Sequence, residues 1–497
     1  MNRALKRMSI AVLVMFLLLL VNVNYLQAFE APSLASRPEN IRTIEDQNQI
    51  QRGPIVTSDG LTVASSKSVS NGNYQRQYPG GAAFAPVTGF EGVNGDAGME
   101  EAEDSLLSGT GSQLAFRNFI DMITNKPEEG ATVELTINSK AQQAAYNGLV
   151  SILQGTNRVG GVVALNPSTG AILAMASYPS YNPNQFATAN GTEFNSLDQH
   201  LIAESPSPLT NNATQTTLPP GSTFKVITSS AYFTQNPSSN TTTGVYSPQV
   251  LTLQQSSQQL HNDAGETCGS AGANGNVPII DAFALSCDTT FANIGMELGG
   301  STLNAMAEKY GFNTAPSITG VTTVPSNYSI SASSALTAYT AIGQWNDTAT
   351  ALQEAMDAAA VANNGVLMKP YLVQQVTASD LSVVRSQQAA EMSQPISSSV
   401  ANYVRQMMVA VTQQPDGTGY AFNASNEGGL VIAGKTGTAQ TIIGSGVDDA
   451  AFIAFAPASD PKIAVGVMVE GAGYGATAAA PIAVNVIKAY LASVGQG

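Results

Sequence analysis

The sequence predicts an α+β protein, and three observations lead to this fold class. β-rich segments occur at both ends of a region that begins near Gly130, and the segments between them have mostly helical periodicity. Strands at the two ends of a domain most economically share one sheet, with the intervening helices packed against it and beside it. The chain of 497 residues is also longer than one hydrophobic core usually supports. We therefore expect an antiparallel sheet with helices packed on it, a helical subdomain, and a smaller module nearer the N-terminus.

The first 29 residues have the pattern of a membrane anchor. Basic residues lie among the first seven positions, and no further charge occurs before Glu30. A helix over residues 8–29 reaches roughly 33 Å, which is enough to cross the core of a bilayer. Basic residues stay on the cytoplasmic side, so we expect residues 1–29 to form a cytoplasmic tip and one transmembrane segment, with the remainder outside the cell membrane. A cleaved signal peptide is the alternative, because the strongest apolar run is short.

Residues 30–130 are predicted to form a separate, irregular module. They contain turn signals such as SDG, SNGN and YPGG, and a polar acidic stretch, GVNGDAGMEEAEDS, that forms a loop or a helix. From Thr132 the residues alternate as in a strand, and from Ala141 they follow a helical pattern. We therefore expect the domain boundary near Gly130 and a larger domain over residues 131–497.

The larger domain contains recognisable strands and helices in order. GGVVALNPSTGAILAMAS has two β-rich runs around a turn, which predicts a hairpin. ALQEAMDAAAVANNG is typical of a helix that stops at Asn-Gly. Near the C-terminus, LVIAGKTGTAQTII, AAFIAFAPA and KIAVGVMVE are strand-length runs that predict an antiparallel meander, and APIAVNVIKAYLASV predicts a final helix.

The composition excludes several classes of function. The net charge is −15 and the isoelectric point is near 4.5, so nucleic acid is not an expected partner, because phosphate binding needs a basic surface. The two histidines, His200 and His261, are far apart in sequence, and no segment has metal-ligand spacing. We expect no metal and no cofactor, and neither a zinc hydrolase nor a serine-histidine triad is supported.

The chain has two cysteines, Cys268 and Cys287. Outside the cytoplasm such a pair is a candidate disulfide, and two unrelated buried thiols are the alternative.

The segment LPPGSTFKVITSSAYF, residues 218–233, places Ser222 and Lys225 three positions apart where a helix begins. The prolines favour an extended entry, and Gly221 permits a tight turn. Residues three apart share a helix face, so the lysine amine can approach the serine oxygen and, if held neutral, take its proton. Backbone amides of the first helical turn also point to where an oxyanion would form. The alternative is a helix cap with a surface lysine.

The chain contains a second Ser-x-x-Lys, from Ser459 to Lys462. Its middle residues, Asp-Pro, mark a turn, so we expect a solvated loop there.

A third element, GKTGTAQ, lies in a strand-like run. Lys435 supplies a fixed positive charge, Thr436 and Thr438 supply hydroxyls, and Gly437 lets another backbone, such as that of a substrate, approach the strand closely. This combination suits a carboxylate. An edge strand protected by a lysine is the alternative.

Ser-x-x-Lys followed far downstream by Lys-Thr-Gly resembles the penicillin-binding protein and serine β-lactamase family. The middle element of that family corresponds to Ser286, Cys287 and Asp288 in LSCDTTF. The family usually has asparagine at the third position, whose amide can donate hydrogen bonds. An ionised Asp288 only accepts them, so we expect it to pair with Lys225 or Lys435 and to disfavour a neutral lysine. The alternative is a protonated Asp288, which would donate as asparagine does.

The resemblance extends along nearly the whole chain. RPENIR, RGPIVTSDG, YPGGAAFAPVTGF, ALNPSTGAILAMASYPSYNPN, PPGSTFK, AIGQ and GVLMKPYLV follow one another as in class B penicillin-binding proteins. The arrangement looks most like the actinobacterial penicillin-binding protein A type, related to the cell-division transpeptidases, and the cysteine pair also looks like that subgroup. The resemblance implies a transpeptidase domain over residues 131–497 and a dimerisation-like module over residues 30–130.

The resemblance also implies a mechanism and partners. Ser222 attacks a peptidoglycan stem peptide ending in D-Ala-D-Ala, Lys225 takes its proton, and Ser286 relays a proton to the departing D-alanine. Lys435, Thr436 and Thr438 bind the terminal carboxylate, and the backbone amides of Ser222 and Thr438 form the oxyanion hole. The expected partners are stem peptides, β-lactam antibiotics, the cytoplasmic membrane, a membrane glycan polymerase and other division or elongation proteins. The alternatives are a D,D-carboxypeptidase or β-lactamase, a β-lactam sensor, and a non-catalytic scaffold.

Overall fold

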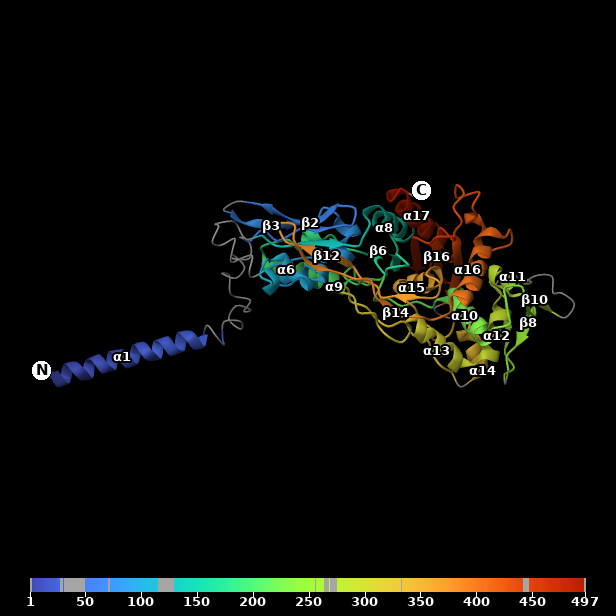
Figure 1. Cartoon of the computed structure of the whole chain (residues 1–497), viewed down its shortest axis with the longest axis horizontal. Helices are drawn as coiled ribbons and strands as arrows, with labels where there is room; N and C mark the ends of the chain where they lie inside the picture. The colour runs from blue at the N-terminus through green and yellow to red at the C-terminus, as the bar shows by residue number, and fades with distance from the viewer. Residues whose placement is uncertain are drawn as a thin grey trace.

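The computed structural model describes residues 2–26, 30, 50–69, 72–114, 129–254, 256–262, 268, 275–331, 333–440 and 447–495. Three parts follow one another along the long axis of the molecule: an N-terminal helix, a small module and a larger domain (Figure 1).

The N-terminal helix α1, Asn2–Tyr25, stands apart from the rest of the chain (Figure 1). Its segment Lys6–Tyr25 spans 20 residues with a mean hydropathy of 2.2, and none of its most apolar stretch is buried against the protein. By length and composition it is able to cross a membrane.

The small module contains a six-stranded sheet with the order β13-β12-β4-β1-β2-β3. Its strands come from three parts of the chain: β1 (Ile55–Val56), β2 (Thr62–Ser68), β3 (Tyr74–Gln77), β4 (Thr132–Leu135), β12 (Val373–Thr377) and β13 (Val383–Ser386). The sheet therefore takes strands from both sides of the boundary predicted at Gly130. The position of that domain boundary stays a prediction. The acidic stretch forms two short helices, α5 (Gly98–Ala102) and α6 (Asp104–Leu107), so the module is more regular than its turn-rich sequence indicated.

The larger domain is built on a five-stranded antiparallel sheet with the order β15-β16-β17-β5-β6. The predicted hairpin is β5 (Gly160–Leu165) with β6 (Ile172–Tyr178), and the predicted meander is β15 (Ala433–Gln440), β16 (Asp448–Ala456) and β17 (Ile463–Val469). The prediction that both strand groups share one sheet is confirmed, and so is the α+β class.

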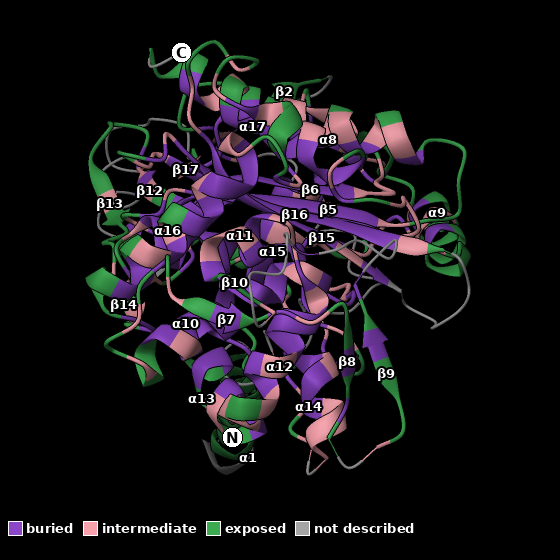
Figure 2. Cartoon of the chain, turned by 90° about the vertical axis from the view of Figure 1, so that its right-hand side faces the viewer, coloured by how far each residue is buried: buried purple, intermediate pink, exposed green. Residues whose placement is uncertain are grey.

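Helices cover both faces of this sheet, and the layers are mostly buried (Figure 2). α8 (Ser139–Leu153) and the C-terminal helix α17 (Ala479–Ser493) pack on one face. α15 (Ala351–Ala362) packs on the other, and every one of its residues is buried. Its alanine-rich sequence permits very close packing, since a Cβ on Gly466 of β17 would lie 2.3 Å from the backbone nitrogen of Ala355.

A helical subdomain lies beside β15, which is an edge strand of the sheet. Its helices include α10 (Lys225–Gln235), α11 (Ile279–Ala284), α12 (Asp288–Leu298), α13 (Gly300–Tyr310), α14 (Ser334–Thr340) and α16 (Ser398–Gln413). Two small antiparallel pairs, β7 (Gly244–Tyr246) with β10 (Asn276–Pro278) and β8 (Val250–Thr252) with β9 (Gln259–His261), extend from it. The predicted site residues lie where this subdomain meets β15.

Candidate active site

Ser222 lies in a one-turn 3₁₀ helix, η6 (Gly221–Phe224), that leads directly into α10. We call Pro220 to Phe224 the nucleophile turn. Gly221 has φ of 58° and donates its N–H to the carbonyl oxygen of Gly343 at 2.9 Å. A Cβ on Gly221 would lie 2.6 Å from the carbonyl oxygen of Thr438, so only glycine lets β15 approach the turn this closely.

Lys225 is fully buried at the start of α10, and its Nζ faces the Ser-Cys-Asp element. It donates to the carbonyl oxygen of Ser286 at 2.7 Å and to Oδ1 of Asp288 at 2.6 Å, and it lies 3.2 Å from Oγ of Ser286. Ser286 has φ of 60°, an unfavourable backbone conformation for a serine, and strained residues of this kind occur preferentially at functional sites.

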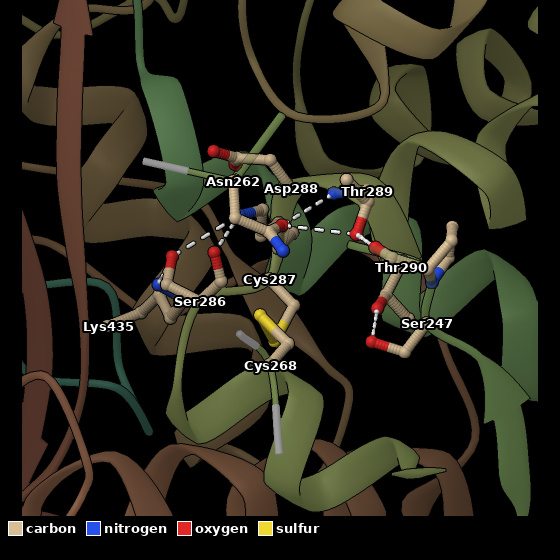
Figure 3. Close-up of a disulfide and its surroundings, with 11 residues drawn as sticks. Ser247, Asn262, Cys268, Ser286, Cys287, Asp288, Thr289, Thr290 and Lys435 are labelled. Carbon is tan, nitrogen blue, oxygen red and sulfur yellow. Dashed lines mark hydrogen bonds and ion pairs between the residues drawn. A yellow bond between two sulfur atoms is a disulfide. The ribbon is translucent and has the colours of Figure 1, made fainter. Parts of the chain in front are cut away.

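Lys435 of β15 is also fully buried, and it lies next to the same serine (Figure 3). Its Nζ lies 2.8 Å from Oγ of Ser286 and 2.9 Å from the carbonyl oxygen of Thr436. Burial, and secondly the positive charge of Lys225, lower the pKa of Lys435 well below its usual value. The charge of Lys435 is therefore less fixed than the sequence indicated, and an anionic ligand would favour its charged form.

Asp288 pairs with Lys225, one of the two partners that the sequence predicted, and not with Lys435. The Asp288 side chain is 19% exposed, while that of Lys225 is fully buried. An adjacent carboxylate favours the charged form of a lysine. The ion pair therefore opposes the neutral amine that a general base requires.

We predict that Asp288→Asn accelerates acylation of the protein by a fluorescent penicillin at neutral pH, by roughly tenfold, because removal of the carboxylate lowers the free-energy cost of a neutral Lys225. The rate constant of labelling measures this effect. Asp460→Asn is the matched control, since Asp460 pairs with Lys462 at 2.7 Å on the protein surface. An unchanged rate in Asp288→Asn would exclude a rate-limiting effect of this carboxylate.

One pocket of about 690 Å³ joins the three sequence elements. It is lined by Ser222 from the nucleophile turn, by Ser286 and Asp288, and by Thr436 and Thr438 of β15. Both buried lysine amines reach the pocket wall through Oγ of Ser286. The volume lies in the range of small-ligand sites. The tertiary structure thus brings together residues that are more than 200 positions apart in the sequence.

Several lining residues were not predicted from the sequence. Thr418 has its Oγ1 2.7 Å from Oγ1 of Thr436, and no motif indicated it. Gln344 lines the pocket next to Gly343 and belongs to the AIGQ segment, for which the sequence predicts no role. Tyr474 and Asp448 line the far side, where the N–H of the adjacent Gly475 contacts Oγ1 of Thr438 at 3.4 Å.

Gly437 lies where β15 passes close to the nucleophile turn. The close approach at this position is made by the chain itself, because a Cβ on Gly437 would lie 2.7 Å from the carbonyl oxygen of Pro220 and 2.9 Å from Cγ2 of Thr223. Glycine is thus required where β15 packs against the nucleophile turn. Contact of Gly437 with substrate stays a prediction, as does the oxyanion hole of the Ser222 and Thr438 amides.

Cys268 and Cys287 form a disulfide with their Cα atoms 5.7 Å apart (Figure 3). Cys287 lies between Ser286 and Asp288, and Cys268 lines the pocket. The neighbouring Asn262 accepts a hydrogen bond from the N–H of Thr289 at 3.0 Å. These contacts connect the Ser-Cys-Asp element and the start of α12 to Cys268 and Asn262.

The second Ser-x-x-Lys lies in an exposed turn between β16 and β17, as predicted. Lys462 is 36% exposed and pairs with Asp460, which is 75% exposed. It has no contact with the pocket residues among those described.

The fold and this pocket define a serine acyltransferase in which two lysines flank a second serine. Residues 160–488 match the family described as penicillin binding protein transpeptidase domain, and residues 52–133 match penicillin binding protein A dimerisation domain. The chain belongs to the penicillin-binding protein transpeptidase family.

Similar proteins place the chain within this family. It is 37% identical to peptidoglycan D,D-transpeptidase PbpA of Mycolicibacterium smegmatis, over 99% of each chain. It is 35% identical to PbpA of Mycobacterium tuberculosis, also over 99% of each chain. The structure of penicillin-binding protein A from M. tuberculosis as a penicillin G acyl-enzyme complex has a TM-score of 0.80 and 35% identity, and it covers 89% of this chain and 99% of its own. The resemblance to class B penicillin-binding proteins is thus confirmed.

Proposed function

We propose that this protein is a peptidoglycan D,D-transpeptidase that cross-links stem peptides through an acyl-enzyme on Ser222 and is acylated there by penicillin. The observation that carries the proposal is the pocket that Ser222 and Ser286 both line, with Oγ of Ser286 3.2 Å from Nζ of Lys225 and 2.8 Å from Nζ of Lys435. The relatives are named as D,D-transpeptidases, and a neighbouring structure is a penicillin acyl-enzyme.

Each site residue has a proposed role in this reaction. Ser222 attacks the carbonyl of the penultimate D-alanine, and its proton passes to Lys225 once that amine is neutral. Ser286, hydrogen-bonded to both lysines, returns a proton to the D-alanine that leaves. Thr436, Thr438 and Lys435 bind the carboxylate of the terminal D-alanine, and that anion favours the charged form of Lys435. An amine of a neighbouring stem then attacks the acyl-enzyme and forms the cross-link.

We further propose that α1 spans the cytoplasmic membrane once, with the pocket on the outer side. The uncharged stretch of α1 after Arg7 and the basic residues at the N-terminal end of the helix support this orientation. We also propose that the small module holds the larger domain at a distance from the membrane and provides a docking surface for a membrane glycan polymerase.

Mass spectrometry of the full-length protein in detergent after penicillin treatment tests the proposal. We expect one covalent adduct on the peptide that contains Ser222. A stem-peptide donor with an added amine acceptor should then give mainly the amide product. Hydrolysis alone would indicate a D,D-carboxypeptidase or β-lactamase, an adduct without turnover a sensor, and absence of an adduct a non-catalytic scaffold.

A further inference from the structure

A buried carboxyl group contacts the nucleophile turn and is not among the residues that line the pocket. Glu354 of α15 is fully buried, and its Oε1 lies 2.9 Å from Oγ1 of Thr223, the residue after Ser222. Its other oxygen, Oε2, is buried and has no hydrogen-bond partner. No described cation forms an ion pair with it. The chemistry proposed for Ser222, Lys225 and Lys435 does not use this group.

The contacts of the Thr223 hydroxyl indicate which groups donate hydrogen bonds at the nucleophile turn. Oγ1 of Thr223 lies 2.9 Å from the carbonyl oxygen of Pro220 and 2.9 Å from Oε1 of Glu354. A hydroxyl has one hydrogen, and a peptide carbonyl only accepts. Both contacts are hydrogen bonds only if Thr223 donates to Pro220 and a protonated Glu354 donates to Thr223. An ionised Glu354 would accept the hydrogen bond of the Thr223 hydroxyl, and the Pro220 carbonyl would then lose its donor.

We propose that Glu354, as a neutral carboxylic acid, is a positioning residue that holds the nucleophile turn in its reactive geometry through Thr223, a role that rests on the acylation proposed at Ser222. The turn is fixed from three sides. Gly221 donates to Gly343, the Pro220 carbonyl packs against Gly437 of β15, and Thr223 accepts from Glu354 of α15. Without the contact between Thr223 and Glu354, the nucleophile turn is no longer held against α15.

The surroundings of Glu354 favour its neutral form. Burial is the larger influence and raises the pKa of Glu354 to about 8, and the lowering that a hydrogen bond donated by Thr223 would cause is smaller. Asp357, one helical turn away, is also buried with a raised pKa, and it accepts from Gln353 at 2.8 Å. Ionisation of both neighbouring carboxyl groups would be less favourable than ionisation of one, because their negative charges repel each other. Asp357 therefore does not stabilise an ionised Glu354.

The elements packed against α15 bring little charge to this region. β5, β17 and β11 (Leu367–Met368) contain no titratable residue. The titratable residues of the other packed elements are Glu308, Lys309 and Tyr310 on α13, Tyr403 and Arg405 on α16, and Asp448 and Asp449 at the start of β16. Of these, Tyr310 lies near Asp357, and Arg405 bonds Asn364 beyond the end of the helix at 2.8 Å. Lys225 and Lys435 lie on the pocket side of the turn.

The proposal has a defined pH dependence. The carboxyl has a usual pKa of 4.5 and a folded-state pKa of about 8, so folding keeps the proton on between these values. The free energy of unfolding therefore falls as the pH rises from about 4.5 to about 8, and it is lowered no further by this group above that pH. Across the upper end of the same range, Thr223 donates to the ionised Glu354 instead of to Pro220, so the Thr223–Pro220 hydrogen bond is lost and acylation slows.

Glu354→Gln keeps a hydrogen-bond donor to Thr223 but cannot ionise, because the glutamine amide donates at every pH. We would measure the acylation rate constant of full-length protein in detergent with a fluorescent penicillin from pH 6 to 10. The ratio of the Glu354→Gln rate to the wild-type rate is expected to be near one at pH 6 and to rise to about three- to tenfold above pH 9, the effect of one hydrogen bond. Asp357→Asn is the matched control from the same helix, and its ratio is expected to stay constant.

Two further measurements complete the test. Glu354→Leu, which fills the site without a donor, is expected to acylate about three- to tenfold more slowly than wild type at pH 6. The melting temperature of Glu354→Gln is expected to equal that of wild type near pH 4.5 and to exceed it above pH 8. A constant Glu354→Gln ratio, or a wild-type rate in Glu354→Leu, would overturn the proposal. A wild-type protein that penicillin does not acylate would instead overturn the function proposed for Ser222.

Discussion

Ser222→Ala is expected to abolish covalent labelling by penicillin. Ser222 lines the same pocket as Ser286, whose Oγ is contacted by Lys225 of α10 and Lys435 of β15. Without the hydroxyl no ester can form, and loss of a nucleophilic serine reduces turnover by about 10⁶-fold in a well-studied hydrolase. The measurement is intact-protein mass spectrometry of the full-length chain after prolonged exposure to penicillin, where wild type gains one adduct and the variant none.

Ser459→Ala is the matched control for this experiment. Ser459 begins the second Ser-x-x-Lys, which lies in an exposed turn. This variant is expected to be labelled like wild type. An adduct on Ser222→Ala, with the modified peptide mapped elsewhere, would show that another residue is the nucleophile.

Lys225→Met is expected to have the second largest effect. Methionine is close to lysine in length and is compatible with the fully buried position, but it cannot accept a proton from Ser222. Positioned general bases contribute about 10²–10⁴-fold to rate, so the acylation rate constant is expected to fall by that factor. Labelling with a fluorescent penicillin measures the rate, and thermal unfolding verifies that the variant is folded.

Lys462→Met supplies the control for lysine removal, because Lys462 is exposed and pairs only with Asp460 among the described residues. Its acylation rate is expected to match that of wild type. If Lys225→Met retained a rate within about threefold of wild type, the base would have to be sought elsewhere, and Lys435, whose pKa is lowered by burial, would be the first alternative.

Much of the larger domain could be predicted from local pattern. Alternating apolar residues and turn signals predicted β5, β6 and the β15–β17 meander, and helical periodicity ending at Asn-Gly predicted α15. These patterns can be recognised in the sequence because the side-chain periodicity of a strand or a helix follows from backbone geometry over a few residues. The small module was harder to predict, since its sheet includes β12 and β13 from residues 373–386, which lie far from β1–β4 in sequence.

The site divides in the same way. The motifs gave Ser222, Lys225, Ser286, Asp288 and Lys435, all of which lie in or behind one pocket. Their motifs could not show which lysine Asp288 would pair with. They also gave no signal for Thr418 or Glu354, because an isolated threonine or glutamate in a sequence resembles any other.

The sequence by itself determined the family, the types of catalytic side chain and the order of the strands and helices, since these depend on short motifs and local periodicity. Only the tertiary structure decided that Asp288 takes Lys225, that Gly437 accommodates Pro220, and that Glu354 lies buried behind Thr223. The physical reason is that pairing, close approach and desolvation depend on distances between segments that the chain brings together only when it folds.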